Sequence, residues 1–90
     1  MIENFKHRGL RELFETGKSS RVPADLRKRI SARLDVLHAA RTMVDLQQPS
    51  LRFHRLVPTE RYAIDVNGPW RITFEWRDGK AIAVDLEQYH

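Results

Sequence analysis

Four side chains in the second half of the sequence have the chemistry to move protons and to hold a negative charge. They are His54, Arg71 and the closing pair Tyr89 and His90. An imidazole gains and loses protons near neutral pH, and a phenol can do so where its surroundings help. A guanidinium stays charged and matches a phosphate group with two parallel hydrogen bonds. Together these residues offer acid–base groups and a cation for an anionic substrate.

Strand periodicity predicts that these side chains share one surface. Over residues 70–77, apolar and polar residues alternate, so Arg71 points away from the apolar face of its strand. His54 likewise opposes the apolar residues of its own segment, and the segment that ends at Tyr89 and His90 belongs to the same predicted sheet. If helices cover the apolar face, the uncovered face gathers all four residues.

Such a group suits the cleavage of RNA without a metal ion. The nucleophile is then the 2′-hydroxyl of the RNA. The protein supplies only help in removing that proton, a cation for the phosphate, and an acid for the leaving 5′-oxygen. A plainer interpretation stays open on spacing alone. In it, Arg71 is a solvated residue that pairs with Glu75 or Asp85. Tyr89 is then ordinary edge packing, and His90 is a solvated tail.

Two amphipathic helices are predicted in the first half of the chain. The first covers residues 9–17 and ends at Gly17. The second begins near Pro23, which suits a first turn because that position needs no amide donor. Its apolar residues form one continuous stripe, which consists of Leu26, Ile30, Leu34 and Leu37. Its cations lie mostly off that stripe and form a strongly basic side that suits contact with RNA phosphates: Arg27, Lys28, Arg29 and Arg33.

Shorter signals follow the second helix. Thr42 can cap a further turn through Leu46, and Pro49 breaks the helical region. From Leu51 the pattern changes to the alternation typical of strands. The candidate strands are residues 51–56, 61–66, 70–76 and 80–86, with another possible strand at residues 2–6.

Turn residues and element order predict the fold class. Asn67-Gly68-Pro69 and Asp78-Gly79 separate the last three strands, and Asp78-Gly79 is the strongest hairpin signal in the chain. A strand, two helices and then antiparallel strands predict an α+β domain over residues 1–90. The two helices are expected to pack on one face of a mainly antiparallel sheet.

Composition excludes several classes of protein. The 90 residues include 16 Lys and Arg against 12 Asp and Glu, and the net charge of +4 favours polyanionic partners. The basic excess lies in residues 1–45, with 10 basic and 6 acidic side chains. Cysteine is absent, which excludes disulfides, thiolate metal sites and a cysteine nucleophile. No apolar run suits a membrane span or a signal peptide, so a cytoplasmic protein without membrane partners is expected.

Motifs for bound cofactors are also missing from the sequence. There is no Gly-rich phosphate loop and no Gly-x-Ser-x-Gly elbow, and no His or acidic pair has the spacing of metal ligands. The sequence therefore predicts neither a cofactor nor a metal. His7 and His38 lie at the ends of predicted elements and are expected to be surface residues.

Several segments, taken together and in order, resemble a known family. They are Phe5-Lys6-His7-Arg8-Gly9-Leu10, Leu13-Phe14-Glu15-Thr16-Gly17, Trp70-Arg71-Ile72-Thr73-Phe74 and the closing Tyr89-His90. With this set the chain resembles HigB toxins, in the RelE/ParE superfamily of bacterial toxin–antitoxin systems. The resemblance implies a RelE-like α+β toxin that enters the A site of the 70S ribosome and cuts mRNA. It also implies a HigA-like helix-turn-helix antitoxin and binding of operator DNA through that antitoxin.

The resemblance also implies roles for the candidate residues. His54 and His90 would handle substrate protons, Arg71 would stabilise the phosphate, and Tyr89 would stack on or orient a base. The family often carries a lysine just after the second strand and an acid directly before the terminal pair. Val57 and Gln88 stand at those positions here. Arg55 or Arg61 could supply the missing cation.

An alternative function follows from these two departures. The chain could be a non-catalytic homologue that acts by binding. It would then be either a ParE-like inhibitor of gyrase or a component of a DNA-binding repressor complex.

Overall fold

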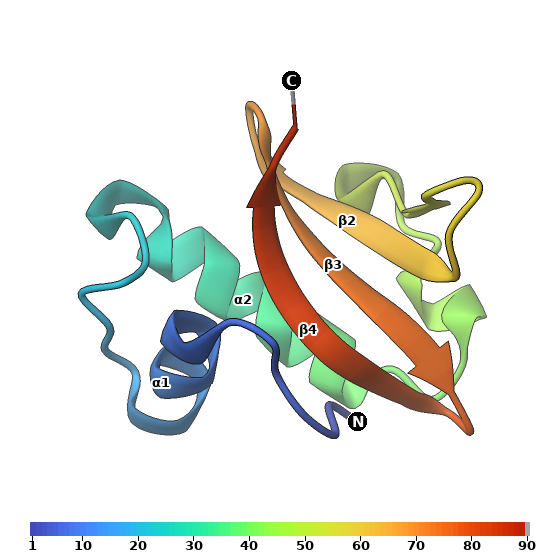
Figure 1. Ribbon diagram of the computed structural model, residues 1–90, viewed down its shortest axis with the longest axis horizontal. Helices are drawn as coiled ribbons and strands as arrows, with labels where there is room; N and C mark the ends of the chain where they lie inside the picture. The colour runs from blue at the N-terminus through green and yellow to red at the C-terminus, as the bar shows by residue number, and fades with distance from the viewer. Residues whose placement is uncertain (90) are drawn as a thin grey trace.

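An antiparallel sheet of four strands and two α-helices make up the residues that the computed structural model describes, 1–89 (Figure 1). Each element is identified by its bounds. The helices are α1 (Arg8–Thr16) and α2 (Arg27–Ala39), and the strands are β1 (His54–Arg55), β2 (Arg61–Asn67), β3 (Trp70–Arg77) and β4 (Lys80–Gln88). Short 3-10 turns lie at Ala24–Leu26, Met43–Leu46 and Pro49–Leu51. The predicted α+β class is confirmed.

The sheet is a simple meander. Its strand order is β1-β2-β3-β4, and every neighbouring pair is antiparallel. The β3–β4 connection is the predicted Asp78-Gly79 hairpin, with φ of 52° and 74° at the two residues. Positive φ at both central residues is the type I′ geometry, whose twist matches that of the flanking strands. This tight hairpin fixes the pairing of β3 and β4 as far as Ile82, beyond which a bulge shifts the register by one residue.

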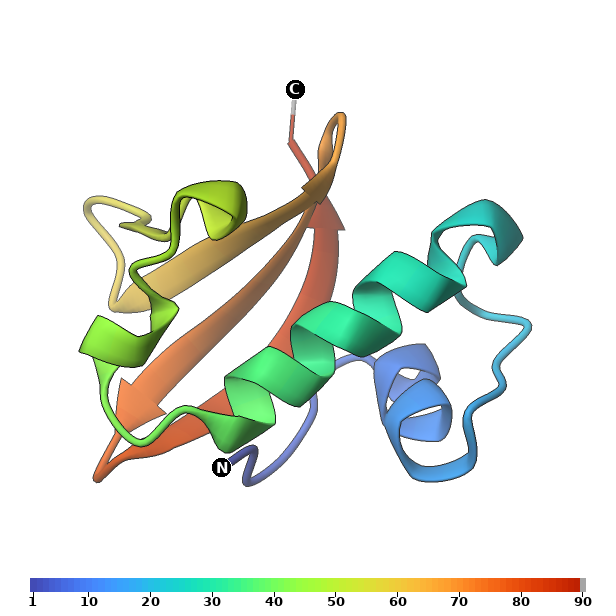
Figure 2. The same ribbon diagram turned by 180° about the vertical axis from the view of Figure 1, so that it is seen from behind.

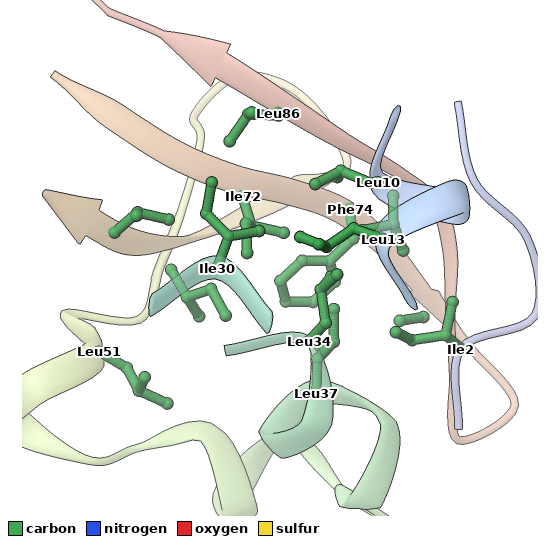
Figure 3. Close-up of a cluster of buried hydrophobic side chains, with 14 of the residues drawn as sticks. Ile2, Leu10, Leu13, Ile30, Leu34, Leu37, Leu51, Ile72, Phe74 and Leu86 are labelled. Carbon is green, nitrogen blue, oxygen red and sulfur yellow. The ribbon is translucent and has the colours of Figure 1, made fainter. Parts of the chain in front are cut away.

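Both helices lie on one side of the sheet. Figure 2 shows α2 crossing the near face, whereas Figure 1 shows the opposite face with no helix over it. The apolar stripe of α2 packs against the sheet through Ile30, Leu34 and Leu37, all fully buried, and meets Ile72 and Phe74 of β3 in one core (Figure 3). Fully burying one such side chain contributes about 1.5–3 kcal/mol. The core therefore packs against one face of the sheet, and among residues 1–89 no helix covers the other face (Figure 1).

Local sequence explains where the helices begin and end. His7 caps α1, because its Nδ1 accepts the Leu10 amide at 3.1 Å. Gly17 ends α1 in the left-handed region with a φ of 80°, as predicted. Pro23 precedes a 3-10 turn that leads directly into α2. The predicted turn after Thr42 is also present, and the Arg41 and Thr42 amides that donate to Asp45 lower the pKa of its carboxyl.

His38 is exposed, as expected of a surface residue, whereas His7 is half-buried, and both histidines also have structural roles. His7 is half-buried at the cap of α1. The His38 ring lies 5.1 Å from that of Phe14, and its Nδ1 accepts the Ile2 amide at 3.1 Å. Both imidazoles therefore hold backbone groups of the N-terminal segment and of α1.

The predicted strand at residues 2–6 is wrong. The N-terminal segment runs parallel to β4 but forms only two isolated bridges, from Ile2 to Ala81 and from Phe5 to Val84. A bulge in β4 explains the interruption. Ala83 has a φ of 53°, and its amide turns to the Asn4 side chain at 2.6 Å instead of joining a continuous ladder.

The predicted strand at residues 51–56 is mostly wrong. Only His54 and Arg55 pair with β2. Leu51 instead closes the 3-10 turn that begins at Pro49 and is buried in the core. Arg52 then takes a left-handed φ of 47°, which ends the turn just before the short strand. Separately, among residues 1–89 no helix is long and apolar enough to cross a membrane.

Candidate active site

The sheet face without helices carries the candidate site and is called the open face below. Cross-strand register defines two neighbouring rows on it. The first row runs through His54, Ala63, Thr73 and Asp85, and the second through Asp65, Arg71 and Glu87. Since strands lie about 4.8 Å apart, His54 is about 10 Å across the sheet from the β3 row position. The side chains of His54 and Arg71 therefore rise from one surface, as predicted.

Arg71 is anchored by an aromatic ring rather than by an acid. Its guanidinium carbon lies 4.6 Å from the centre of the Tyr89 ring. Asp65 and Glu87 flank it in register, yet within residues 1–89 Arg71 forms no ion pair. Its buried Nε has no hydrogen-bond partner either. The cation is thus held in place while its charge is not neutralised by direct contact.

Tyr89 is positioned by the turn between β2 and β3. Its amide donates to the Pro69 carbonyl at 3.0 Å, which fastens the end of the chain beside that turn. Tyr89 is 40% exposed, and its ring packs against the Arg71 guanidinium. His90 lies outside the described residues, and its predicted role stays a prediction.

When the His54 imidazole is neutral, its contacts favour the tautomer with the hydrogen on Nδ1. Its Nδ1 lies 2.7 Å from the Arg52 carbonyl oxygen. A carbonyl only accepts, so Nδ1 carries the hydrogen and Nε2 keeps its lone pair. The residue is exposed on β1, the short edge strand. In this tautomer Nε2 is therefore the ring nitrogen of His54 that can accept a proton.

A polar network that the sequence analysis missed crosses the middle of the open face. One terminal nitrogen of Arg61 donates to the Thr73 hydroxyl at 3.0 Å and to the Ala83 carbonyl at 2.8 Å. The Thr73 hydroxyl in turn donates to the Glu87 carboxylate. The other terminal nitrogen of Arg61 lies 3.6 Å from Glu75. Three strands are thereby tied together beside Arg71.

The signal for this network was present in the sequence. Thr73 and Glu87 follow the same alternation as Arg71 and Tyr89, which placed them on the polar side of their strands. The bulge at Ala83 was not visible, and it is the bulge that turns a backbone carbonyl toward Arg61. Gln88 is in register with Trp70 on the other face, so the carboxylate beside Arg71 comes from Glu87.

Because of this network, the Arg61 guanidinium is not freely available to bind a substrate. Its side chain is only 19% exposed and is bound on both terminal nitrogens. Arg55 is paired in register with Tyr62, whose ring stacks on Phe53, so it lies on the side away from His54. Arg55 also donates to the Thr59 carbonyl at 3.1 Å. Val57 is 78% exposed in the loop between β1 and β2.

The predicted RNA-binding cations of α2 are partly engaged within the molecule. Three of them donate to backbone carbonyls at 3.1–3.3 Å: Arg27 to Val22, Arg29 to Val66 and Arg33 to Asp65. Each guanidinium has five N–H donors, so further donors remain on each. Lys28 is exposed and, among residues 1–89, makes no side-chain hydrogen bond or ion pair. The described residues contain no group of three or more His, Asp or Glu side chains arranged to hold a metal ion.

Replacing Thr73 with valine tests the network. The substitution keeps the shape of a fully buried side chain and removes the hydroxyl that joins Arg61 to Glu87. We expect the free energy of unfolding to fall by about 1–3 kcal/mol, because partners are left without their hydrogen bond. Chemical denaturation measures this. Thr59→Val serves as the control, because its hydroxyl bonds only within an exposed loop. Equal stability of the Thr73 variant and wild type would remove the structural role of the network.

Comparison with known proteins shows the family to which the chain belongs. A family model described as the RelE-like toxin of type II toxin–antitoxin system HigB matches residues 3–90. Endoribonuclease HigB of Proteus vulgaris is 38% identical over 92 residues, which cover 100% of both chains. Toxin HigB-1 of Vibrio cholerae is 30% identical over 93 residues, which cover 99% of this chain and 98% of that one. The chain therefore belongs to the HigB family of RelE-like toxins of type II toxin–antitoxin systems.

Proposed function

We propose that this toxin is a ribosome-dependent endoribonuclease that cleaves mRNA without a metal ion. The observation that carries the proposal is Arg71, an unpaired cation held against an exposed aromatic ring on the open face. The name of the Proteus vulgaris relative, an endoribonuclease, supports the same activity. Stacking of a base on Tyr89 would bring its phosphate near the Arg71 guanidinium.

The proposed reaction needs only groups of this chain and of the RNA. His54 Nε2 accepts the proton of the 2′-hydroxyl, and the 2′-oxygen then attacks the neighbouring phosphorus. A 2′,3′-cyclic phosphate forms as the bond from phosphorus to the 5′-oxygen breaks. Arg71 holds the charge that develops on the phosphate oxygens. His90 is proposed to give its proton to the leaving 5′-oxygen, so that the proton lost in the first step is balanced in the second.

The partners follow from this proposal and from the family. A type II system pairs a toxin with an antitoxin, and we propose a HigA-like helix-turn-helix protein that also carries the complex to operator DNA. The ribosome presents the mRNA, which would place the toxin in the cytoplasm. We propose that the remaining donors of Arg27, Lys28, Arg29 and Arg33 contact ribosomal RNA, with Arg55 as a secondary candidate, whereas the contacts of Arg61 within the sheet argue against such a role for it.

Mapping of mRNA 5′ ends after induction in growing cells tests the proposed function. We expect new ends inside translated codons soon after induction, and none in messages that are not being translated. Intact mRNA with DNA-damage signalling would instead favour the gyrase alternative. The neighbouring reading frame is a second check, because a small helix-turn-helix gene beside this one fits a toxin–antitoxin pair.

Replacing His54 with alanine tests the proposed base. We expect cleavage on purified translating ribosomes to slow about 10²–10⁴-fold, the usual contribution of general acid–base catalysis. In the wild type the rate should first rise and then fall with pH between about pH 5 and 8, because the proposed base must be neutral to accept a proton and the proposed acid must be protonated to give one. The variant should lose that rise. His38→Gln is the matched control, since His38 bonds the Ile2 amide away from the open face. A His54 variant with the wild-type rate and pH profile would contradict the role.

A further inference from the structure

We propose that Lys6, Arg8 and Arg11, together with the ring of Phe5, form a binding site for RNA phosphates beside the open face. This set is called the N-terminal cradle below. The inference rests on the proposed action on RNA and adds a second contact region to it. The four residues line a shallow hollow of about 180 Å³. Sites for drug-sized ligands occupy about 300–1,000 Å³, so this hollow suits a compact group such as a phosphate.

The cations of the cradle are free of acidic partners. Within residues 1–89, none of Lys6, Arg8 and Arg11 takes part in an ion pair or a side-chain hydrogen bond, and all three are exposed. The first turn of α1 contains no acidic residue either. Six of the 13 other Lys and Arg side chains form ion pairs, which are Arg21 with Glu12, Arg52 with Asp65, Arg55 with Glu60, Arg61 and Arg77 with Glu75, and Lys80 with Glu3. Three unneutralised charges around one hollow favour an anion with several charges.

The backbone under the cradle is fixed at both ends. The amides of Lys6 and His7 both donate to the Val84 carbonyl of β4, at 2.8 and 3.2 Å. His7 then caps α1, which sets the positions of Arg8 and Arg11 one turn apart. The Phe5 ring is held by Phe14, with ring centres 5.7 Å apart. Because the backbone does not have to be ordered by the ligand, binding costs less conformational entropy.

The position of the cradle links it to the candidate active site. Val84 is followed by Asp85, which lies on the open face in register with Thr73. The cradle therefore borders the β4 edge of that face, with α1 beside β4 in Figure 1. An RNA strand that lies across the open face can continue over this edge onto the three cations. Phosphate contacts of this kind set the register of a nucleic acid but do not read its sequence.

The salt dependence of RNA binding gives the expected contribution of the cradle to affinity. Each phosphate contact on a single strand adds about 0.7 to the slope of log affinity against log salt concentration. Three contacts make that slope steeper by about 2, so raising salt fourfold costs the wild type about 20-fold more affinity than a protein without them. The triple variant Lys6→Ala, Arg8→Ala, Arg11→Ala should lose this part of the slope.

The experiment measures the affinity of the full chain for two probes at salt concentrations from about 50 to 200 mM. Phosphate contacts change the affinity strongly over this range. One probe is the 70S ribosome programmed with an mRNA whose A-site 2′-hydroxyls are methylated, so that it cannot be cut. The other is a free single-stranded RNA with the same modification. The control triple variant, Lys18→Ala, Arg41→Ala, Lys80→Ala, removes the same net charge away from the hollow. Thermal melting of each variant checks that the fold is kept.

The outcomes separate the source of the phosphates. A shallower slope for the cradle variant with both probes supports contact with mRNA, and a shallower slope with ribosomes alone supports contact with ribosomal RNA. Slopes equal to those of the control variant with both probes would overturn the cradle. The proposed nuclease is judged separately by cutting of unmodified mRNA. A wild type that binds through the cradle and cuts nothing would refute the nuclease and leave the cradle standing.

Discussion

Replacing Arg71 with alanine is expected to lower the rate of mRNA cleavage on translating ribosomes about 10²–10³-fold, the cost of removing one donor to a developing charge. The fold should survive the change. Within residues 1–89, Arg71 makes no ion pair, and its buried Nε has no hydrogen-bond partner to lose. Its main contact is the Tyr89 ring, and such cation–π contacts contribute about 0.5–1 kcal/mol at exposed sites.

Two further variants sharpen the test of Arg71. Arg77→Ala is the control, because Arg77 lies on the same strand, is exposed and pairs with Glu75. It should keep the wild-type rate. Arg71→Lys keeps the charge but loses the planar fork that binds two phosphate oxygens, so we expect it to restore only part of the activity. The proposed site is incorrect if Arg71→Ala cleaves translated mRNA as fast as Arg77→Ala does.

Deleting Tyr89 and His90 is expected to abolish toxicity while changing stability little. Stacking of a base on an aromatic ring is worth about 1–3 kcal/mol, and a proton carrier about 10²–10⁴ in rate, so the combined loss should be about 10³-fold or more. In the folded protein Tyr89 contributes one backbone hydrogen bond, to Pro69, and the contact with Arg71. Together these contribute about 1–2.5 kcal/mol.

Single substitutions of Tyr89 separate its contribution to activity from that of His90. Tyr89→Phe keeps the ring and should keep most of the activity if the ring acts by stacking. Tyr89→Ala should slow cleavage about 5- to 150-fold, as the stacking free energy predicts. Growth arrest by the truncated chain at wild-type potency would exclude an essential role for the pair. A truncated chain that unfolds at low temperature would show that the pair is structural.

Much of the fold could be predicted from local patterns. The stripe of Leu26, Ile30, Leu34 and Leu37 predicted α2 and its buried side, because helical periodicity places these residues on one face. Asp78-Gly79 predicted the β3–β4 hairpin, because few sequences accept positive φ at both central residues. The strand predictions that were wrong concern short segments at the edges of the sheet. Residues 2–6 and 51–56 have strand-like alternation, but a bulge at Ala83 and a 3-10 turn at Pro49 limit their pairing.

Alternation along the strands also determined which residues of the site share a face. It placed His54 and Arg71 on the side away from the core, and the register of the sheet agrees. Alternation depends only on the pleat of each strand, so it can be taken from the sequence alone. It gives no information on which neighbours touch across strands, because that depends on register, bulges and turns.

Only the tertiary structure decided which charges are available. The sequence contains 16 Lys and Arg residues without marking the paired ones. Folding binds Arg61 into the network with Thr73 and Glu87, and it leaves Arg71 against Tyr89 without an acidic partner. Pairing of charges depends on contacts between residues far apart in the chain, such as Arg61 and Ala83. The sequence by itself therefore determined the residue types and the faces of this toxin, and the packing of β2, β3 and β4 selected the cation of its candidate site.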